Sequence, residues 1–129
     1  MIHGLAHVNI RAPEAMIERV RRFYVNVLGL TDGARPPFRS RGYWLYAGDR
    51  DLIHLTIDPA MSGIVPATTG WLDHFAFAAS GLDGMLARLD KEGVAYEVDR
   101  VPSSGEAQVF LRDPAGIAIE LNFAAGQSA

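Results

Sequence analysis

Three histidines and one glutamate occupy matching places in the two halves of this chain. His7 and His74 lie 67 residues apart, and His54 and Glu120 lie 66 residues apart. Near pH 7 an imidazole is largely neutral and a carboxylate is ionised, which is the state in which each binds a metal. Together they form good sites for divalent first-row metals. The spacing therefore predicts a metal site to which both halves contribute.

Residue alternation places these four side chains on the less apolar face of their predicted strands. Each lies opposite the large apolar side chains of its own predicted strand, as His54 does to Ile53 and Leu55. A sheet with helices on its apolar face would turn all four toward one concave interior. A single strand histidine is more often solvated than ligating, as we expect for His3. The joint placement of the four favours a metal.

The elements that must position these residues are predicted in the same order twice. The first half reads as a strand at 2–11, a helix opened by Pro13 and ended by Gly29, a turn-rich stretch at 31–41, and strands at 43–47 and 52–57 joined by a hairpin. The second half reads as a strand at 71–79, a helix from Leu82 that ends at Gly93, and strands at 96–101, 107–112 and 117–123. An internal duplication in an α+β fold follows, with modules at about 1–58 and 71–124 and a linker at about 59–70.

Composition excludes several classes of protein. The chain has 129 residues, a formal net charge of −3 and no cysteine, which excludes disulfides, iron–sulfur clusters and cysteine zinc sites. A mildly acidic balance argues against a nucleic-acid partner. We find no apolar run of transmembrane length and no signal peptide, so we expect no membrane partner and a cytoplasmic location.

Five segments carry a resemblance to a known family. They are His7 in LAHVNI, FYVNVLGL at 23–30, His54 in DLIHL, His74 in WLDHFAF, and RDPAGIAIELNF at 112–123. With them the chain resembles the vicinal oxygen chelate superfamily of glyoxalases, bleomycin resistance proteins and extradiol dioxygenases. The resemblance implies a single domain over residues 1–129, built from two tandem βαβββ modules whose curved mixed sheets enclose a divalent Fe, Mn, Ni, Co or Zn ion. It also implies a small-molecule substrate that presents two neighbouring oxygens to the metal, and a homodimer.

The resemblance also implies roles for individual residues. His7, His74 and Glu120 match the family's metal ligands, and His54 stands where glyoxalase I has a glutamate that is both ligand and base. His54 and Glu120 are therefore the catalytic candidates, with His54 either a fourth ligand or an acid/base beside the metal. Arg11 matches a glutathione-contacting arginine, although a solvated strand end is an equal alternative. Five aromatic residues are candidate pocket walls, with ordinary core packing as the alternative for each: Tyr43, Trp44, Tyr46, Phe110 and Phe123.

Three functions remain open from the sequence. The first is a metal-dependent enzyme of glyoxalase type, a lyase or isomerase. The second is a small Fe(II) extradiol-type dioxygenase, for which His7, His74 and Glu120 supply the two-histidine, one-carboxylate set. The third is a resistance protein that modifies fosfomycin or binds bleomycin. In a fosfomycin enzyme the loop arginines Arg35, Arg39 and Arg41 would face the phosphonate, unless they are simply solvated.

Overall fold

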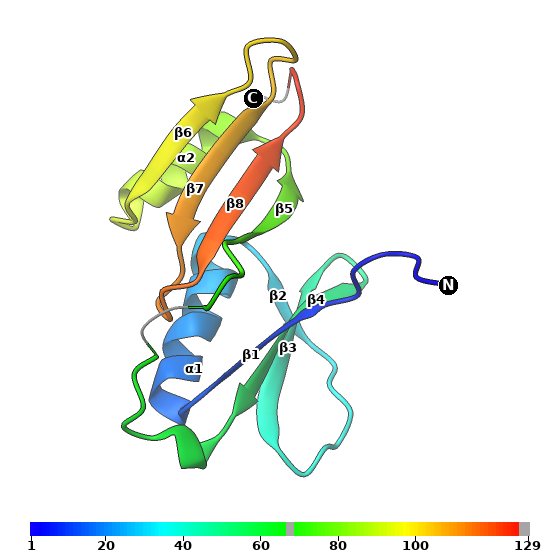
Figure 1. The fold of residues 1–129 in the computed structure, drawn as a ribbon, viewed down its shortest axis with the longest axis vertical. Helices are drawn as coiled ribbons and strands as arrows, with labels where there is room; N and C mark the ends of the chain where they lie inside the picture. Colours follow the sequence, from blue (N-terminus) through cyan, green and yellow to red (C-terminus); the bar gives the residue numbers. More distant parts are fainter. Residues whose placement is uncertain (67–68, 127–129) are drawn as a thin grey trace. The chain divides into compact units, whose positions relative to one another are not determined.

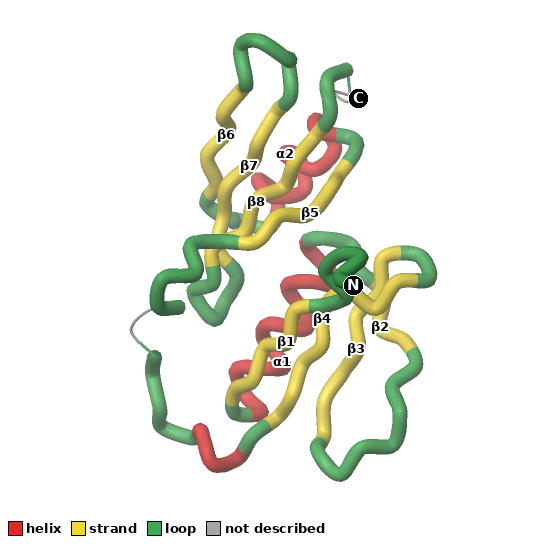
Figure 2. Tube along the Cα trace, turned by 45° about the vertical axis from the view of Figure 1, so that its right-hand side comes forward, coloured by secondary structure: helices red, strands yellow, loops and turns green. Residues whose placement is uncertain are grey.

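The computed structural model describes residues 1–66 and 69–126, which form parts of two compact units, Met1–Val65 and Pro66–Ala129 (Figure 1). The boundary falls inside the predicted linker at 59–70, of which residues 67 and 68 lie outside the described residues. Each unit holds a four-stranded mixed sheet with its main helix on one face (Figure 2). The predicted α+β fold of two tandem βαβββ modules is confirmed.

The first unit follows the predicted order of elements with one addition. Its elements are β1 (Val8–Ala12), α1 (Glu14–Arg22) with a π-helical extension (Phe23–Val27), β2 (Thr31–Gly33), β3 (Arg41–Ala47), β4 (Arg50–Ile57) and a short 3-10 turn (Pro59–Met61). The sheet order is β1-β4-β3-β2, with β1 and β4 parallel. The resemblance implies a strand here, but the residue pattern gives only a turn-rich stretch at 31–41, because the three residues of β2 are too few to show a period.

The second unit repeats the same arrangement. Its elements are β5 (Phe75–Ala79), α2 (Leu82–Lys91), β6 (Tyr96–Arg100), β7 (Ala107–Arg112) and β8 (Ala118–Phe123). The sheet order is β5-β8-β7-β6, with β5 and β8 parallel. Within residues 1–66 and 69–126, no helix has the length and apolar character needed to span a membrane.

The apolar face of each sheet carries the core of its unit. Helix α1 packs on β1, β3 and β4, where alternate strand residues are buried with the apolar stripe of the helix. The buried apolar side chains here include Ile10, Ile17, Val20, Leu45, Ile53, Leu55 and Ile57, and those of the second unit include Leu82, Leu89, Val109, Leu111, Ile119, Leu121 and Phe123. We call the opposite side of each sheet its open face. It carries Trp44 and His54 in the first unit and Phe110 and Glu120 in the second.

The strand registers relate the two units residue by residue. Asn9 of β1 pairs with His54 of β4, and Ala76 of β5 pairs with Glu120 of β8. His7 and His74 each lie two residues before the paired residue of their strand. The four predicted ligands therefore occupy equivalent places in two equivalent sheets.

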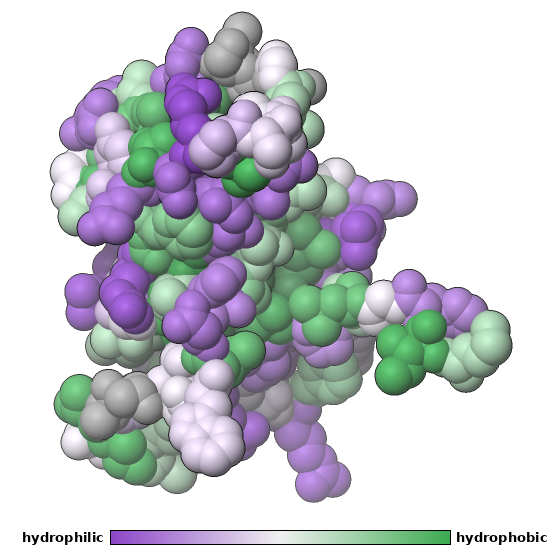
Figure 3. Space-filling view, turned by 45° about the horizontal axis from the view of Figure 1, so that its top comes forward, coloured by the Kyte–Doolittle hydropathy of each residue, from purple (hydrophilic) through white to green (hydrophobic). Residues whose placement is uncertain are grey.

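The first strand of each unit is shorter than its alternation predicts. β1 begins at Val8 and β5 at Phe75, directly after His7 and His74. Alternation marks which residues suit a strand, but a strand also needs a neighbour that takes its hydrogen bonds. Residues 1–7 form an arm instead, with Ile2 and Leu5 exposed, and Figure 3 shows apolar surface along it.

A matched pair of glycine substitutions tests the packing of the first sheet. At Gly42 in β3, a Cβ atom would lie 1.9 Å from the carbonyl oxygen of Leu55, which is backbone and cannot move away cheaply. We expect Gly42→Ala to lower the free energy of unfolding by about 3 kcal/mol or more. In the control, Gly84→Ala in α2, the added Cβ meets nothing within 4 Å. That change should stabilise by roughly 0.5–1 kcal/mol. Urea unfolding measures both, and equal effects would contradict the strand pairing described here.

Candidate functional site

A stack of three rings forms the first-unit part of the candidate site. The His54 ring lies parallel to that of His7, with centroids 3.8 Å apart and 13° between the planes. It also lies parallel to the Trp44 ring, at 4.0 Å and 9°. Two rings at these distances can only occupy opposite faces of His54. The imidazole is therefore clamped between His7 and Trp44, and the His54 side chain is buried.

A carboxylate fixes the edge of the same imidazole. His54 Nε2 lies 2.6 Å from Asp51 Oδ2, and since an ionised carboxylate only accepts, Nε2–H is the donor. Residues three apart in a regular strand point to opposite faces. Here the β3–β4 register shifts between Leu45 and Tyr46, so Leu52 is an extra residue and Asp51 turns toward His54. This hydrogen bond holds the pKa of the Asp51 carboxyl below its usual range.

The stacking decides how His7 and His54 can act together. An imidazole nitrogen binds a metal through a lone pair that lies in the plane of its ring. Parallel rings with centroids 3.8 Å apart have separate planes, so an ion in the plane of one lies well outside the plane of the other. In this arrangement the two histidines cannot both ligate one ion. Because Asp51 engages Nε2 of His54, His7 is the freer of the two to bind a metal.

The second-unit part brings a histidine and a carboxylate together. His74 Nε2 lies 3.9 Å from Glu120 Oε1. His74 Nδ1 donates to Asp73 Oδ2 at 2.6 Å, and Gln108 Nε2 donates to Glu120 Oε1 at 3.0 Å. Metal-binding histidines commonly have their second nitrogen held by a carboxylate in this way. Neighbouring ligands on one ion are roughly 3.0–3.4 Å apart, so a small side-chain rotation brings this pair onto a metal.

Phe110, a predicted pocket wall, lies on the open face of the second sheet. It pairs across β7 and β8 with Glu120, as Trp44 pairs across β3 and β4 with His54. Its ring meets the His74 ring edge-on, with centroids 6.2 Å apart. Each candidate pair thus has one aromatic side chain beside it at the same register position.

Arg11 lies on the open face of the first sheet, but a carboxylate of the chain occupies it. Its Nε donates to Asp58 Oδ2 at 2.8 Å. This contact holds the pKa of the Asp58 carboxyl below its usual range. Arg11 is therefore neutralised by its neighbour, which disfavours the predicted role in binding a glutathione carboxylate.

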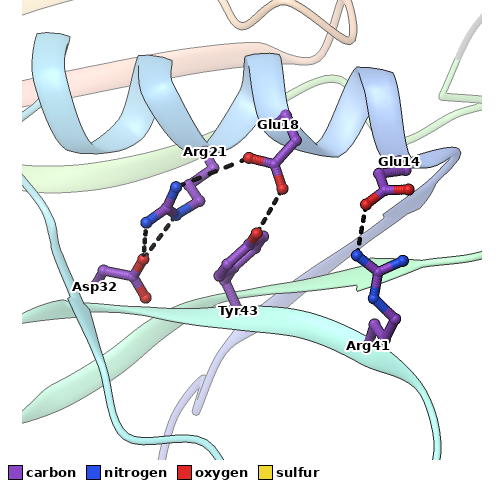
Figure 4. Close-up of polar contacts among 6 residues, drawn as sticks. All are labelled: Glu14, Glu18, Arg21, Asp32, Arg41 and Tyr43. Atoms are coloured by element: carbon purple, nitrogen blue, oxygen red, sulfur yellow. Dashed lines mark hydrogen bonds and ion pairs between the residues drawn. The ribbon is translucent and has the colours of Figure 1, made fainter.

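The structure does not bring Tyr43 together with the other candidates. Tyr43 precedes Trp44 in β3 and so points to the helix-covered face, where its hydroxyl donates to Glu18 Oε1 at 2.5 Å and Arg21 lies 4.4 Å above its ring (Figure 4). The hydrogen bond to Glu18 raises the pKa of Tyr43. Two further ion pairs hold the helix to the sheet: Arg21–Asp32 joins α1 to β2, and Arg41–Glu14 joins α1 to β3. Tyr43 ties α1 to the sheet, and we do not include it in the proposed site.

The predicted ligands thus form two pairs, His7 with His54 and His74 with Glu120. In the part of the chain that the structure describes, no three or more metal-binding side chains gather in one place. Sequence reasoning missed the three polar side chains that orient these pairs, which are Asp51, Asp73 and Gln108. Asp73 could have been found from its position next to His74 in the sequence. The contacts of Asp51 and Gln108 depend on strand register, which the sequence does not show.

Two βαβββ modules, each with one ligand candidate directly before its first strand and one in its last strand, define a vicinal oxygen chelate fold. Residues 4–121 match the profile of the Glyoxalase/Bleomycin resistance protein/Dioxygenase superfamily, and the chain belongs to this superfamily.

Solved structures agree with this assignment. A protein from Bacillus anthracis assigned to the glyoxalase family is 25% identical, with a TM-score of 0.73 over 96% of this chain and 97% of that one. A glyoxylase/bleomycin resistance protein/dioxygenase domain from Frankia sp. EAN1pec is 20% identical, with a TM-score of 0.77 over 98% and 95%. Lactoylglutathione lyase from Agrobacterium tumefaciens is 22% identical, with a TM-score of 0.65 over 95% and 94%. No curated protein matches the chain.

Proposed function

We propose that this protein is a divalent-metal-dependent enzyme of glyoxalase type, a lyase or isomerase whose small substrate presents two neighbouring oxygens. His7, His74 and Glu120 hold the metal, and His54 acts beside it as acid and base. The observation that carries this proposal is the equivalent register of the four side chains in the two sheets. From the resemblance and the composition, we also propose a homodimer and a cytoplasmic location.

The choice of ligands follows from which nitrogens and oxygens are oriented. His74 donates its Nδ1–H to Asp73, so its Nε2 carries the lone pair that can bind the metal. Nε2 is also the nitrogen nearer Glu120. Gln108 holds one Glu120 oxygen and restricts the carboxylate without adding charge. Two imidazoles and one carboxylate suit Fe, Mn, Co, Ni or Zn and leave positions for a substrate.

His54 is better suited to proton transfer than to ligation. Since its Nε2–H donates to Asp51, its Nδ1 carries the lone pair that can take a proton from the substrate. The carboxylate stabilises the imidazolium that forms, as in other aspartate–histidine pairs. Stacking between His7 and Trp44 keeps the ring from turning away.

The bound metal and the side chains of the protein would have separate roles in the reaction. When bound, the metal supplies a Lewis acid that polarises the substrate oxygens. His54 Nδ1 takes the proton and returns it to another atom of the same substrate. Trp44 and Phe110 flank the two pairs and offer apolar contacts that exclude water from the reacting atoms.

A dioxygenase is the second candidate, and one observation favours it. With His54 engaged by Asp51, the remaining set of His7, His74 and Glu120 is the two-histidine, one-carboxylate triad of non-haem Fe(II) oxygenases. Anaerobic loading with Fe(II), followed by oxygen uptake with catechols, separates this candidate from a lyase or isomerase. Rapid uptake would favour it over the glyoxalase type.

Metal removal tests the proposed function. We expect the protein, purified without chelator, to hold about one metal ion per chain by elemental analysis. Dialysis against a chelator should abolish activity on thiol adducts of 2-oxoaldehydes, and adding back one of the five divalent metals should restore it. If the protein binds none of the five metals but binds bleomycin tightly, it is instead a drug-binding member of the superfamily.

A further inference from the structure

Arg35 lies against the open face of the first sheet, in the loop between β2 and β3. Its Nη2 is 3.3 Å from the position that a Cβ atom of Gly42 would occupy. Strand alternation puts Gly42 on the same face as Trp44, two residues further along β3. The missing side chain of Gly42 therefore makes room for the guanidinium on the face that carries His54.

Among the described residues, the groups that hold this guanidinium are neutral. Nη1 donates to the Ser40 carbonyl oxygen at 2.9 Å, and Nη2 donates to the Ser40 hydroxyl at 3.1 Å. The charged group also lies 5.0 Å above the Phe38 ring. Three other arginines of this unit are each bound to a carboxylate, namely Arg11, Arg21 and Arg41. Arg35 thus keeps its full positive charge on the open face.

The guanidinium also keeps unused hydrogen-bond donors. An arginine has five N–H groups, and Ser40 accepts from two of them. Nε is buried, and within the described residues it has no hydrogen-bond partner. A buried N–H without an acceptor is unfavourable, so the described residues do not fully satisfy this guanidinium.

The position of Arg35 relates it to the proposed catalytic histidine. Trp44 stacks on His54 at 4.0 Å, and the half-exposed Phe38 lies 6.1 Å from Trp44. Trp44 lies two residues from Gly42 on the same strand face, so Arg35 lies on the face that carries the ring stack. Phe38 lies beside both and presents an apolar surface.

We propose that Arg35 binds an oxyanion of the substrate, a carboxylate or a phosphonate, while Phe38 contacts the apolar part that joins it to the reacting oxygens. The planar fork of arginine matches such groups with two parallel hydrogen bonds. The inference rests on the proposed function and narrows its substrate to small anionic molecules.

Binding of simple probes to the full-length protein tests this assignment. Phenylacetate and benzylphosphonate carry the two kinds of oxyanion, and phenylacetamide is the uncharged match. Carboxylates and phosphonates also bind divalent metals, so each titration is repeated after dialysis against a chelator, and only the binding that remains is assigned to Arg35. We expect at least one anion to shift the Arg35 Nε–H signal in nuclear magnetic resonance spectra and to bind at least about tenfold more tightly than the amide. Which anion binds more tightly identifies the group.

Three variants, two of them at Arg35, separate its charge and its geometry from those of other arginines. Arg35→Gln should lose the preference for the anion, whereas Arg19→Gln, which changes an exposed arginine of α1, should bind as the wild type does. Arg35→Lys keeps the positive charge but loses the planar guanidinium, so it should weaken binding of the anion but not of the amide. This variant tests the assignment if Arg35→Gln fails to fold. Equal binding of anion and amide, no binding of either anion, or unchanged binding by both Arg35 variants overturns the assignment. Metal content, measured in the same samples, reports separately on the proposed function.

Discussion

Replacing His74 with alanine is expected to lower metal affinity by more than about 100-fold and to remove activity with it. Loss of a group that merely orients a ligand costs about 10- to 100-fold, so loss of the ligand itself should cost more. Glu120→Gln should have a similar effect, because it removes the negative charge while keeping the hydrogen-bonding partner Gln108 in reach. Elemental analysis and metal titration measure both.

The chain supplies a matched control for this experiment. His3 is the one histidine outside the two pairs, and it lies exposed in the N-terminal arm. His3→Ala should keep the metal content and activity of the wild type. Asp73→Asn should fall between the two, with metal affinity lowered about 10- to 100-fold, because it frees the His74 ring without removing it. Full metal retention by His74→Ala would rule out His74 as a ligand.

The sequence predicted the duplication and the equivalence of the candidate ligands for a definite physical reason. Strand alternation and strand order depend on local side-chain patterns, and these patterns survive in both halves of the chain. Equivalent strands then impose equivalent positions, as the pairing of Asn9 with His54 and of Ala76 with Glu120 shows. The sequence spacing predicted that the four side chains are equivalent, and the strand registers of the two sheets give them equivalent positions.

The sequence could not predict the groups that orient the ligands. Asp51 faces His54 only because the extra residue Leu52 shifts the register of β4, and no local pattern marks such a bulge. Arg35 reaches the open face only because a loop folds over Gly42. Tyr43 and Trp44 were equal candidates for a pocket wall, since the sequence could not say which strand face α1 covers. These contacts are long-range, and alternation carries no information about them.

Substitution of His54 or of its partner Asp51 is expected to cause the second large loss of activity. If His54 transfers the proton, His54→Gln should lower kcat by about 10²- to 10⁴-fold while leaving metal content and KM nearly unchanged. Asp51→Asn should lower kcat by about 10- to 1,000-fold, because the imidazole loses the carboxylate that fixes Nε2–H and stabilises the charged ring. Asp49→Asn, an exposed carboxylate in the adjacent turn, is the matched control and should behave as the wild type.

A second readout distinguishes an acid/base from a ligand even before a substrate is known. Nitrogen chemical shifts of His54 should show the proton on Nε2 in the wild type, and that preference should weaken in Asp51→Asn because the acceptor charge is gone. A metal ligand would respond differently: its bound nitrogen would stay unprotonated in both proteins, and His54→Gln would lose the metal. Loss of metal from His54→Gln would therefore make His54 a fourth ligand, and would require its ring to leave the stack with His7 that the structure shows.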